Sequence, residues 1–418
     1  MKVKAVRLYG KSDLRFEEFE LRDMKEDEIL AKVNTDSLCM SSYKAMLQGS
    51  DHRAIPEGID QDPIIIGHEL CATVVAVGSK VEGGWKPGDT FTCQPKMYFD
   101  GVICAPGYSY PTYGGDATYI VIPGEVMRDQ YLLPYSGEAL FKASLAEPFS
   151  CLVSALHSQY HLMPNHKDHK MGVQEGGHMA ILAGCGPMGI GLAELAMSME
   201  KKPGKIVVTD INEARVERAK ELLKGKNGVE IEVVNTGAME DTAGFLKGLT
   251  GGKGFDDVIV MAPVPGVIEL ADAITGVDSC ISFFAGPTVK DFYAKVNFYD
   301  VHYNYKHIMG TSGGDIDDMR EALALIEKDE VRAEVMVSHV GGLDAAAEAT
   351  LNLPKIPGAK KLIYCQLSMP LTAIADFGEL GKTDPLFAAL DEICRCHNGL
   401  WSAEAEVYLM KHGKSIMD

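Results

Sequence analysis

The first 150 residues consist of short apolar runs separated by residues that form turns. The runs 29–33, 72–77 and 118–122 are rich in Val, Ile and Ala, and Gly, Pro and Asp lie between them. Little of this segment shows the three- to four-residue apolar spacing of an amphipathic helix. Short runs with β-branched residues, bounded by turns, are typical of strands. The pattern therefore predicts a domain built mainly from β-strands.

After Glu147 and Pro148 the pattern changes to alternating helices and strands. Strands that alternate with helices form a parallel sheet covered on both faces. We therefore expect a doubly wound α/β domain. Its predicted elements are helix 150–161, strand 179–183, helix 187–199, strand 205–210, helix 212–224, strand 257–261, helix 265–275 and strand 279–284.

The rest of the chain mixes strands and helices. One amphipathic helix is expected at 317–328, and the C-terminal segment is mainly helical, with Thr383, Asp384 and Pro385 as a helix start. These changes of pattern divide the chain into segments 1–150, 151–312 and 313–418. A polar insertion at 161–177 interrupts the second segment, and its histidines and those beside it are expected in a solvated loop, with metal binding as the lesser alternative. These histidines are His157, His161, His166, His169 and His178.

Composition narrows the class of protein. The 418 residues include 40 basic and 59 acidic side chains, which gives a net charge of −19 and argues against nucleic acid or an anionic membrane as a partner. Neither a signal peptide nor an apolar run of membrane-spanning length is visible. The ten cysteines are scattered, unlike a disulfide framework, which fits a reducing compartment. We expect a cytoplasmic protein of two or three domains.

A glycine-rich loop joins the first predicted strand of the α/β domain to its helix. In the pattern GxGxxG the glycines allow a tight turn, close approach of a pyrophosphate and close helix packing. Asp210 ends the next predicted strand, where a carboxylate can accept the ribose hydroxyls and repels a 2′-phosphate, so we expect NAD(H) in preference to NADP(H). The alternative is a tight turn without a ligand. The predicted cofactor-binding residues are Gly184, Gly186, Pro187, Met188, Gly189, Asp210 and Arg215.

His68 and Glu69 interrupt an otherwise apolar stretch, where a buried charge needs a partner or a metal. Cys39 lies between a predicted strand and a predicted helix, and Glu147 lies at the edge of the α/β domain. Thiolate, imidazole and carboxylate form a set that zinc accepts, with a fourth position left open. Their spacing does not by itself bring them together, and a histidine satisfied within the core stays an alternative.

The order of these motifs resembles the zinc-dependent medium-chain dehydrogenases, above all their branch similar to sorbitol dehydrogenase. The resemblance covers residues 1 to about 365 and includes Cys39, the Gly-His-Glu motif at 67–69, the turn at 88–91, the Gly-Gly-Asp motif at 114–116, Glu147 and the glycine loop. It implies a GroES-like β-barrel catalytic domain, which residues 1–150 begin and residues 313–418 complete, together with a C-terminal helical extension. It also implies a Rossmann domain at 151–312.

The resemblance also implies roles for individual residues. Cys39, His68 and Glu147 would hold one catalytic zinc ion, Glu69 would support it from beside the ligands or coordinate it transiently, and Ser41 would pass the substrate proton onward. Relatives with a second, structural zinc carry four close cysteines, but segment 92–115 contains only Cys93 and Cys104, so no structural zinc is expected. A homodimer or homotetramer is implied, with pairing at strand 279–284.

The insertion, the segment 206–223 and the C-terminal segment resemble L-sorbose-1-phosphate reductases. This implies an oxidoreductase that acts on CH–OH donors and interconverts a ketose phosphate and a polyol phosphate with NAD(P)(H), most specifically L-sorbose 1-phosphate and glucitol 6-phosphate. Three alternatives stay open: a dehydrogenase of unphosphorylated polyols, a zinc-free reductase of the quinone-reductase type, and a non-catalytic nucleotide sensor. The joint presence of Cys39, His68 and Glu147 argues against the second, and Ser41 with the full ligand set argues against the third.

Overall fold

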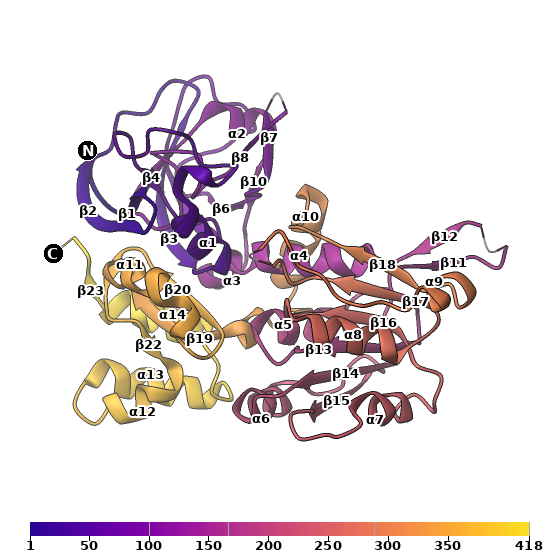
Figure 1. Ribbon diagram of the computed structural model, residues 1–418. Helices are drawn as coiled ribbons and strands as arrows, with labels where there is room; N and C mark the ends of the chain where they lie inside the picture. The colour runs from indigo at the N-terminus through magenta and orange to yellow at the C-terminus, as the bar shows by residue number, and fades with distance from the viewer. Residues whose placement is uncertain (100, 166, 288, 418) are drawn as a thin grey trace. The chain divides into compact units, whose positions relative to one another are not determined.

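The computed structural model describes residues 1–99, 101–165, 167–287 and 289–417, which form two compact units (Figure 1). Unit 1 comprises residues 1–148, 322–329 and 337–418, and unit 2 comprises residues 149–321 and 330–336. Within the described ranges, no helix has both the length and the apolar character needed to cross a membrane.

Unit 1 is built around a curved sheet with one central strand. The central strand is β3 (Ile29–Ser37). On one edge of β3, its first half pairs with β9 (Tyr119–Ile122) and its second half pairs with β20 (Lys360–Tyr364). On the other edge, β3 pairs with β5 (Leu70–Val77). Only β19 and β20 pair in parallel within this sheet, among the described residues. The strands in spatial order are β10 (Leu132–Pro134), β6 (Thr90–Cys93), β5 (Leu70–Val77), β3 (Ile29–Ser37), β20 (Lys360–Tyr364), β19 (Val337–Gly342) and β22 (Thr372–Ala373), with β9 (Tyr119–Ile122) beside β3. The predicted β-domain is confirmed.

Smaller sheets and short helices complete unit 1. Among the remaining strands, β1 (Lys2–Gly10) pairs with β2 (Asp13–Glu20) on one side and β4 (Ile64–Ile65) on the other. β7 (Met97–Phe99) pairs with β8 (Val102–Cys104), and β21 (Leu367–Ser368) pairs with β23 (Lys414–Ser415). The helices are α1 (Met40–Gln48), η1 (Gly49–Asp51), α2 (Gly124–Arg128), α3 (Leu140–Ser144), α11 (Leu343–Asn352), η3 (Leu353–Lys355), η4 (Ile374–Asp376), α12 (Phe377–Leu380), α13 (Pro385–Cys396) and α14 (Ala403–His412). The predicted helix start at Asp384 is confirmed, because its carboxylate accepts a hydrogen bond from the Leu386 N–H at 2.9 Å.

Unit 2 is a doubly wound parallel sheet. Figure 1 shows its strands in the order β18, β17, β16, β13, β14 and β15 from top to bottom, and every pair is parallel. The strands are β13 (His178–Leu182), β14 (Lys205–Asp210), β15 (Glu230–Asn235), β16 (Phe255–Val260), β17 (Thr275–Phe283) and β18 (His307–Gly310). The helices are α4 (Ala146–His157), α5 (Pro187–Ala196), α6 (Glu213–Leu222), α7 (Thr242–Gly248), α8 (Pro265–Ile274), α9 (Phe298–Tyr303), α10 (Ile316–Glu327) and η2 (Ala333–Met336). Helix α4 begins in unit 1, and helix α10 ends in unit 1.

The predicted helices and strands of unit 2 are confirmed to within a few residues, but β15, α7, α9 and β18 were missed. The sequence of β15, EIEVVN, is only partly buried and carries acidic residues, so its apolar signal is weak. The prediction that strand 279–284 offers a pairing edge is wrong. β17 lies between β16 and β18 and is hydrogen-bonded on both sides, so β18 forms that edge of the sheet.

The histidine-rich insertion is a short hairpin, β11 (Tyr160–Leu162) with β12 (His169–Met171), rather than a solvated loop throughout. His161 is only 2% exposed. Its Nδ1 lies 2.8 Å from the Asp278 carbonyl oxygen and its Nε2 lies 3.1 Å from Asp257 Oδ1. The expectation of a solvated His161 is wrong because these acceptors satisfy both ring nitrogens. His166 lies outside the described residues.

The C-terminal extension is anchored in unit 1 by a buried polar chain. The Trp401 indole N–H donates to the Tyr364 hydroxyl at 2.7 Å, and that hydroxyl donates to Glu406 at 3.1 Å. The Glu406 carboxylate also accepts hydrogen bonds from the Leu140 and Phe141 N–H groups at the start of α3, at 2.6 and 2.9 Å. Helix α14 thereby caps α3, which leads directly into α4.

Burial raises the pKa of Glu406 from its ordinary range to about 7, against the opposing effect of its hydrogen-bond donors. A raised folded-state pKa means that the stabilising contribution is present at low pH and is lost as pH rises through about 7. Glu406→Gln has no carboxyl group to ionise at this position, so it does not suffer this loss. The unfolding free energy of the wild type minus that of the variant should therefore fall by on the order of 3 kcal/mol from pH 4.5 to pH 8. Urea unfolding at several pH values measures it. Glu404→Gln, at an exposed position of the same helix, is the control. If the unfolding free energy of the wild type minus that of Glu406→Gln stays constant or grows with pH, the expectation is contradicted.

Candidate metal and cofactor sites

The first predicted ligand, Cys39, lies where β3 ends and α1 begins. Its backbone is still extended, with φ −119° and ψ 144°, and it occupies the cap position of α1. Burial and the negative charge of Glu69 raise the pKa of the Cys39 thiol to about 12. The thiol would therefore ionise only beside a cation, as a metal ligand does.

The Gly-His-Glu motif forms a tight segment between β4 and β5. Gly67 has φ +92°, and a Cβ there would lie 2.6 Å from the Asp116 nitrogen and 2.9 Å from Asp36 Oδ2, so only glycine fits. His68 is 4% exposed and Glu69 is 1% exposed. The predicted burial of this charged pair within an apolar stretch is confirmed.

Three side chains of unit 1 converge at this point. One ligand atom each of Cys39, His68 and Glu69 lies within 4.8 Å of the other two, and no further group of this kind is found among the described residues. A thiolate, an imidazole and carboxylate oxygens match the ligand preferences of zinc. The donor set therefore fits the metal that the sequence predicted.

Glu147 is positioned by the first turn of α4 and is half-buried. It does not belong to the compact group of three ligand atoms. Its charge nevertheless contributes to the raised pKa values of Cys39, Tyr108 and Lys360, so its carboxylate lies in the field of the same site. Glu69 and Glu147 thus both act electrostatically on the Cys39 thiol.

Two serines of α1 contact the imidazole. The Ser42 hydroxyl lies 3.2 Å from His68 Nδ1, while the Ser41 hydroxyl lies 3.2 Å from Nε2 and donates to Cys39 Sγ at 3.0 Å. A partner on Nδ1 orients the ring and leaves Nε2 as the ligand atom. Ser41 lies among the candidate ligand atoms, where a hydroxyl can exchange a proton with a bound substrate.

Tyr108 reaches the site from segment 92–115, and the sequence analysis did not assign it a role there. Its ring packs against His68 at 5.1 Å and stacks on His52 at 5.2 Å between centroids. Its hydroxyl interacts with Ser41, and burial together with the charge of Cys39 holds its pKa well above the ordinary value. Tyr108 is therefore a neutral phenol beside Ser41.

The two cysteines of segment 92–115 each interact with a tyrosine. Cys93 lies beside Tyr113, which is fully buried, and Cys104 lies beside Tyr110. Cys93, Tyr108 and Tyr113 belong to the large hydrophobic core of unit 1, and Tyr110 packs against it. The expectation that it holds no structural zinc stays a prediction.

A lysine far along the chain neutralises Glu69. The Lys360 ammonium donates to both carboxylate oxygens of Glu69, at 2.5 and 2.6 Å. Burial alone would lower the pKa of Lys360, but the charges of Glu69 and Cys39 raise it above its ordinary value, so the lysine stays charged. Lys360 was not among the predicted site residues. The only signal available was a lysine at the start of an otherwise apolar strand, KKLIY.

Two buried acids lie behind the Gly-His-Glu segment. Asp36 Oδ1 accepts a hydrogen bond from the Glu69 N–H at 3.1 Å. Burial and the charge of Asp116 hold the pKa of Asp36 well above its usual value, and burial raises the pKa of Asp116 to about 7. Close carboxyls in a dry environment cannot both ionise easily, so this pair retains a proton at neutral pH.

The predicted dinucleotide loop in unit 2 has the expected geometry. A Cβ on Gly189 would lie 2.1 Å from the Gly184 oxygen, so the loop closes tightly against the start of α5. A Cβ on Gly186, by contrast, would meet nothing within 4 Å, which leaves room for a phosphate. Pro187 begins the ten-residue helix α5, and its cap residue, Gly186, has no side chain that could accept from the first N–H groups. These features fit a pyrophosphate.

Asp210 ends β14 and is 6% exposed. Its Oδ1 accepts hydrogen bonds from the Ile211 and Asn212 N–H groups at 2.8 and 3.0 Å, which fixes the orientation of the carboxylate. Arg215 lies on the exposed side of α6, and its charge acts on Cys185 within the glycine loop. The loop, Asp210 and Arg215 are thus gathered at the carboxyl ends of β13 and β14.

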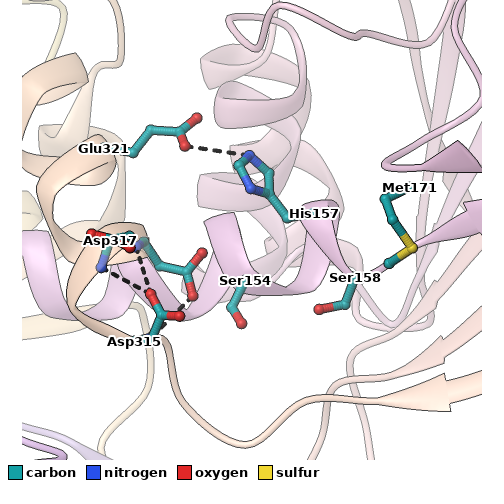
Figure 2. A pocket seen from close by; sticks show the side chains of 8 residues that line it. Ser154, His157, Ser158, Met171, Asp315, Asp317 and Glu321 are labelled. Carbon is teal, nitrogen blue, oxygen red and sulfur yellow. Dashed lines mark hydrogen bonds and ion pairs between the residues drawn. The ribbon is translucent and has the colours of Figure 1, made fainter.

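A cavity of about 350 Å³ in unit 2 is lined by acidic residues but by none of the predicted site residues. Figure 2 shows Glu321 paired with His157, at 3.3 Å. Asp315 accepts hydrogen bonds from the Asp317 and Asp318 N–H groups, both at 2.9 Å, at the start of α10. These acids are therefore engaged in an ion pair and a helix cap.

Comparison with known proteins identifies relatives along nearly the full chain. The family model "Alcohol dehydrogenase GroES-like domain" matches residues 25–129 and "Zinc-binding dehydrogenase" matches residues 187–328. A mannitol-1-phosphate 5-dehydrogenase of Aliivibrio fischeri is 45% identical over 96% of both chains. An L-sorbose 1-phosphate reductase of Klebsiella pneumoniae is 43% identical over 99% of this chain and 98% of its own.

Solved structures support the same fold. A 2R,3R-butanediol dehydrogenase from Bacillus subtilis aligns with a TM-score of 0.72 and 21% identity, over 87% of this chain and 99% of its own. A structure from Sinorhizobium meliloti bound to NADP also gives 0.72, at 18% identity, over 87% of this chain and all of its own. The expected combination of a GroES-like and a Rossmann domain is confirmed. The protein belongs to the zinc-dependent medium-chain dehydrogenases, a family of oxidoreductases that act on CH–OH groups.

Proposed function

We propose that this chain interconverts a ketose phosphate and a polyol phosphate by hydride transfer with NAD(H), most specifically L-sorbose 1-phosphate and glucitol 6-phosphate. The observation that carries this proposal is the identity of 43–45% to two sugar-phosphate enzymes along almost the whole chain, C-terminal extension included. The sorbitol and butanediol dehydrogenases among its relatives are only 23–29% identical. An unphosphorylated polyol is therefore the weaker candidate.

We propose Cys39, His68 and Glu147 as ligands of one catalytic zinc, with Glu69 beside them. When bound, the metal would polarise the substrate oxygen and favour either the carbonyl or the alkoxide form. His68 is already oriented by Ser42, and the convergence of Cys39, His68 and Glu69 argues against a zinc-free mechanism.

The glycine loop and Asp210 would hold the nicotinamide dinucleotide, which accepts or donates the hydride. The helix start at Pro187 would face the pyrophosphate, and Asp210 would accept a hydrogen bond from the ribose. Arg215 would lie beside the adenosine end. Preference for NAD(H) is proposed because the Asp210 carboxylate would repel a 2′-phosphate.

Ser41 would exchange the proton that accompanies hydride transfer. In reduction, the carbonyl carbon takes a hydride from the cofactor and its oxygen takes the Ser41 hydroxyl proton, while Ser41 takes up a replacement proton that comes ultimately from solvent. In oxidation both steps run in reverse. The Ser41 hydroxyl lies 3.0 Å from Cys39 Sγ, so it stands beside the ligand atoms, and the Tyr108 hydroxyl interacts with it there.

We also propose a cytoplasmic location and a homodimer or homotetramer. All ten cysteines are free thiols, as a reducing compartment would keep them. The oligomer rests on the resemblance to the family.

A substrate panel tests the proposed reaction. The purified, zinc-loaded chain should oxidise NADH with L-sorbose 1-phosphate at a kcat/KM at least about 10-fold higher than with unphosphorylated sorbose, since a charged phosphate contact is typically worth about 1.5–3 kcal/mol. Fructose, tagatose and the 1- and 6-phosphates of all three ketoses complete the panel. A preference for fructose 6-phosphate would identify that ketose phosphate as the substrate in place of L-sorbose 1-phosphate. Activity only with free sugars would contradict the proposal.

The ligand role of Cys39 is tested by metal analysis. Wild type should contain about one zinc per chain, and Cys39→Ser should lose most of it, because a hydroxyl is a much weaker zinc ligand than a thiolate. Elemental analysis of the purified proteins measures it. Cys104→Ser, at a half-buried thiol away from the site, should keep its zinc. Zinc retained in full by Cys39→Ser would remove Cys39 from the ligand set.

The role of Asp210 is tested by Asp210→Asn. The amide oxygen can still accept the hydrogen bonds from Ile211 and Asn212 while the negative charge is removed. The ratio of kcat/KM for NADPH to that for NADH should rise about tenfold. This is the effect expected because the repulsion between the Asp210 carboxylate and the 2′-phosphate, worth about 1.4 kcal/mol, is lost. Asp241→Asn, at the cap of α7 in the same unit, is the matched control and should leave the ratio unchanged. A wild type that prefers NADPH would contradict the proposed specificity.

A further inference from the structure

The proposed substrate carries a phosphate next to its reacting carbonyl. In a ketose 1-phosphate the ester oxygen is bonded to the carbon beside the carbonyl, so both groups enter the same site together. A phosphate monoester carries about 1.5–2 negative charges at pH 7, and arginine and N–H donors bind it best. The two lysines that begin β20 are already engaged, since Lys360 is bound by Glu69 and Lys361 donates to backbone carbonyls.

One aromatic ring connects Ser41 to a histidine outside the predicted site. The Tyr108 hydroxyl interacts with Ser41, and the Tyr108 ring lies 5.1 Å from the His68 ring and 5.2 Å from the His52 ring, between centroids. The two imidazole centroids are therefore no more than about 10 Å apart. His52 and Tyr108 are stacked, with 22° between their ring planes. His52 thus lies one ring away from the place where Ser41 would meet the carbonyl.

Hydrogen bonds and core packing hold the segment that carries His52. The Ala54 side chain belongs to the hydrophobic core of unit 1, and the Ala54 carbonyl accepts a hydrogen bond from the Ser109 hydroxyl at 2.7 Å. The Ser109 hydroxyl in turn accepts one from the Ala105 N–H at 3.0 Å. The backbone beside His52 is therefore tied to the segment that carries Tyr108, so the position of His52 does not depend on a ligand.

His52 and Arg53 offer hydrogen-bond donors that no other residue of the described structure uses. The Ala54 N–H donates to His52 Nδ1 at 3.3 Å, so the proton of the neutral ring lies on Nε2. Burial and the charge of Arg53 lower the pKa of His52, which keeps the ring neutral at pH 7. Arg53 is exposed, and its guanidinium forms no hydrogen bond or ion pair with another described residue. The neighbouring acid, Asp51, is bound by Lys11 instead.

We propose that His52 and Arg53 bind the phosphate of the ketose phosphate and thereby select a phosphorylated substrate. The inference rests on the function proposed above and adds to it the residues that recognise the phosphate. With the carbonyl beside Ser41, the phosphate on the neighbouring carbon lies beside Tyr108, within reach of the His52 N–H and the long Arg53 side chain. A guanidinium can donate two parallel hydrogen bonds to phosphate oxygens. Neither residue takes part in hydride transfer.

Arg53→Met tests this site with L-sorbose 1-phosphate and unphosphorylated sorbose as substrates. The variant should lower kcat/KM for L-sorbose 1-phosphate about tenfold or more, mainly through a higher KM, because the lost contact binds the ground state and the transition state alike. Its kcat/KM for sorbose, its zinc content and its KM for NADH should stay at wild-type values. An unchanged kcat/KM for L-sorbose 1-phosphate, or an equal loss with sorbose, would overturn the inference.

Three further variants separate phosphate binding from packing and from general charge. Arg53→Lys keeps the charge without the planar fork and should recover part of the loss. His52→Phe keeps an aromatic ring beside Tyr108 but removes the Nε2 donor, so it should lower kcat/KM for L-sorbose 1-phosphate about fivefold. Arg15→Met, the control, removes an exposed guanidinium of unit 1 that Asp13 binds, and should have no effect. A loss in Arg15→Met as large as that in Arg53→Met would overturn the inference.

The wild type distinguishes this inference from the proposed function. A wild type that reduces sorbose and L-sorbose 1-phosphate equally well would contradict both. A wild type that prefers the phosphorylated ketose, together with Arg53→Met and His52→Phe variants that keep this preference in full, would contradict the inference alone. Inorganic phosphate gives a second readout, because it should compete with L-sorbose 1-phosphate in the wild type and inhibit Arg53→Met about tenfold more weakly.

Discussion

The buried ion pair between Lys360 and Glu69 is the interaction on which the site in unit 1 depends. It joins a segment near the start of the chain to a strand near its end, 291 residues apart, and both groups are withdrawn from water. Two isolated charges there would be costly, but a pair with two short hydrogen bonds is tolerated. Glu69 also donates its N–H to Asp36, so the pair fixes the backbone that carries His68.

Strand β20 also connects the buried ion pair to the C-terminal extension. Lys360 begins the strand, and Tyr364, at its end, donates a hydrogen bond to Glu406. Glu406 in turn caps α3, after which the chain passes directly into the first turn of α4 and Glu147. The extension is therefore connected to both carboxylates of the candidate metal site through one strand and one short helix.

Unit 2 follows a simpler physical rule. Parallel strands end at the same edge of a sheet, and the turns that follow β13 and β14 place the glycine loop and Asp210 together there. Each feature of this site is local: an open face at Gly186, an uncapped helix start and a carboxylate held by the next two N–H groups. Little of it depends on distant contacts, which is why the loop was readable from its motif.

The sequence by itself determined the class of each unit, most elements of the parallel sheet, the glycine loop and the burial of His68 and Glu69, because local periodicity and short motifs encode them. It did not reveal β15, whose polar face weakens its pattern, or the burial of His161, whose acceptors come from distant strands. Only the tertiary structure decided that Cys39, His68 and Glu69 converge, and that Lys360 and Tyr108 join them. Contacts between residues far apart in the chain follow from sheet pairing, and no local pattern specifies a partner for a buried charge.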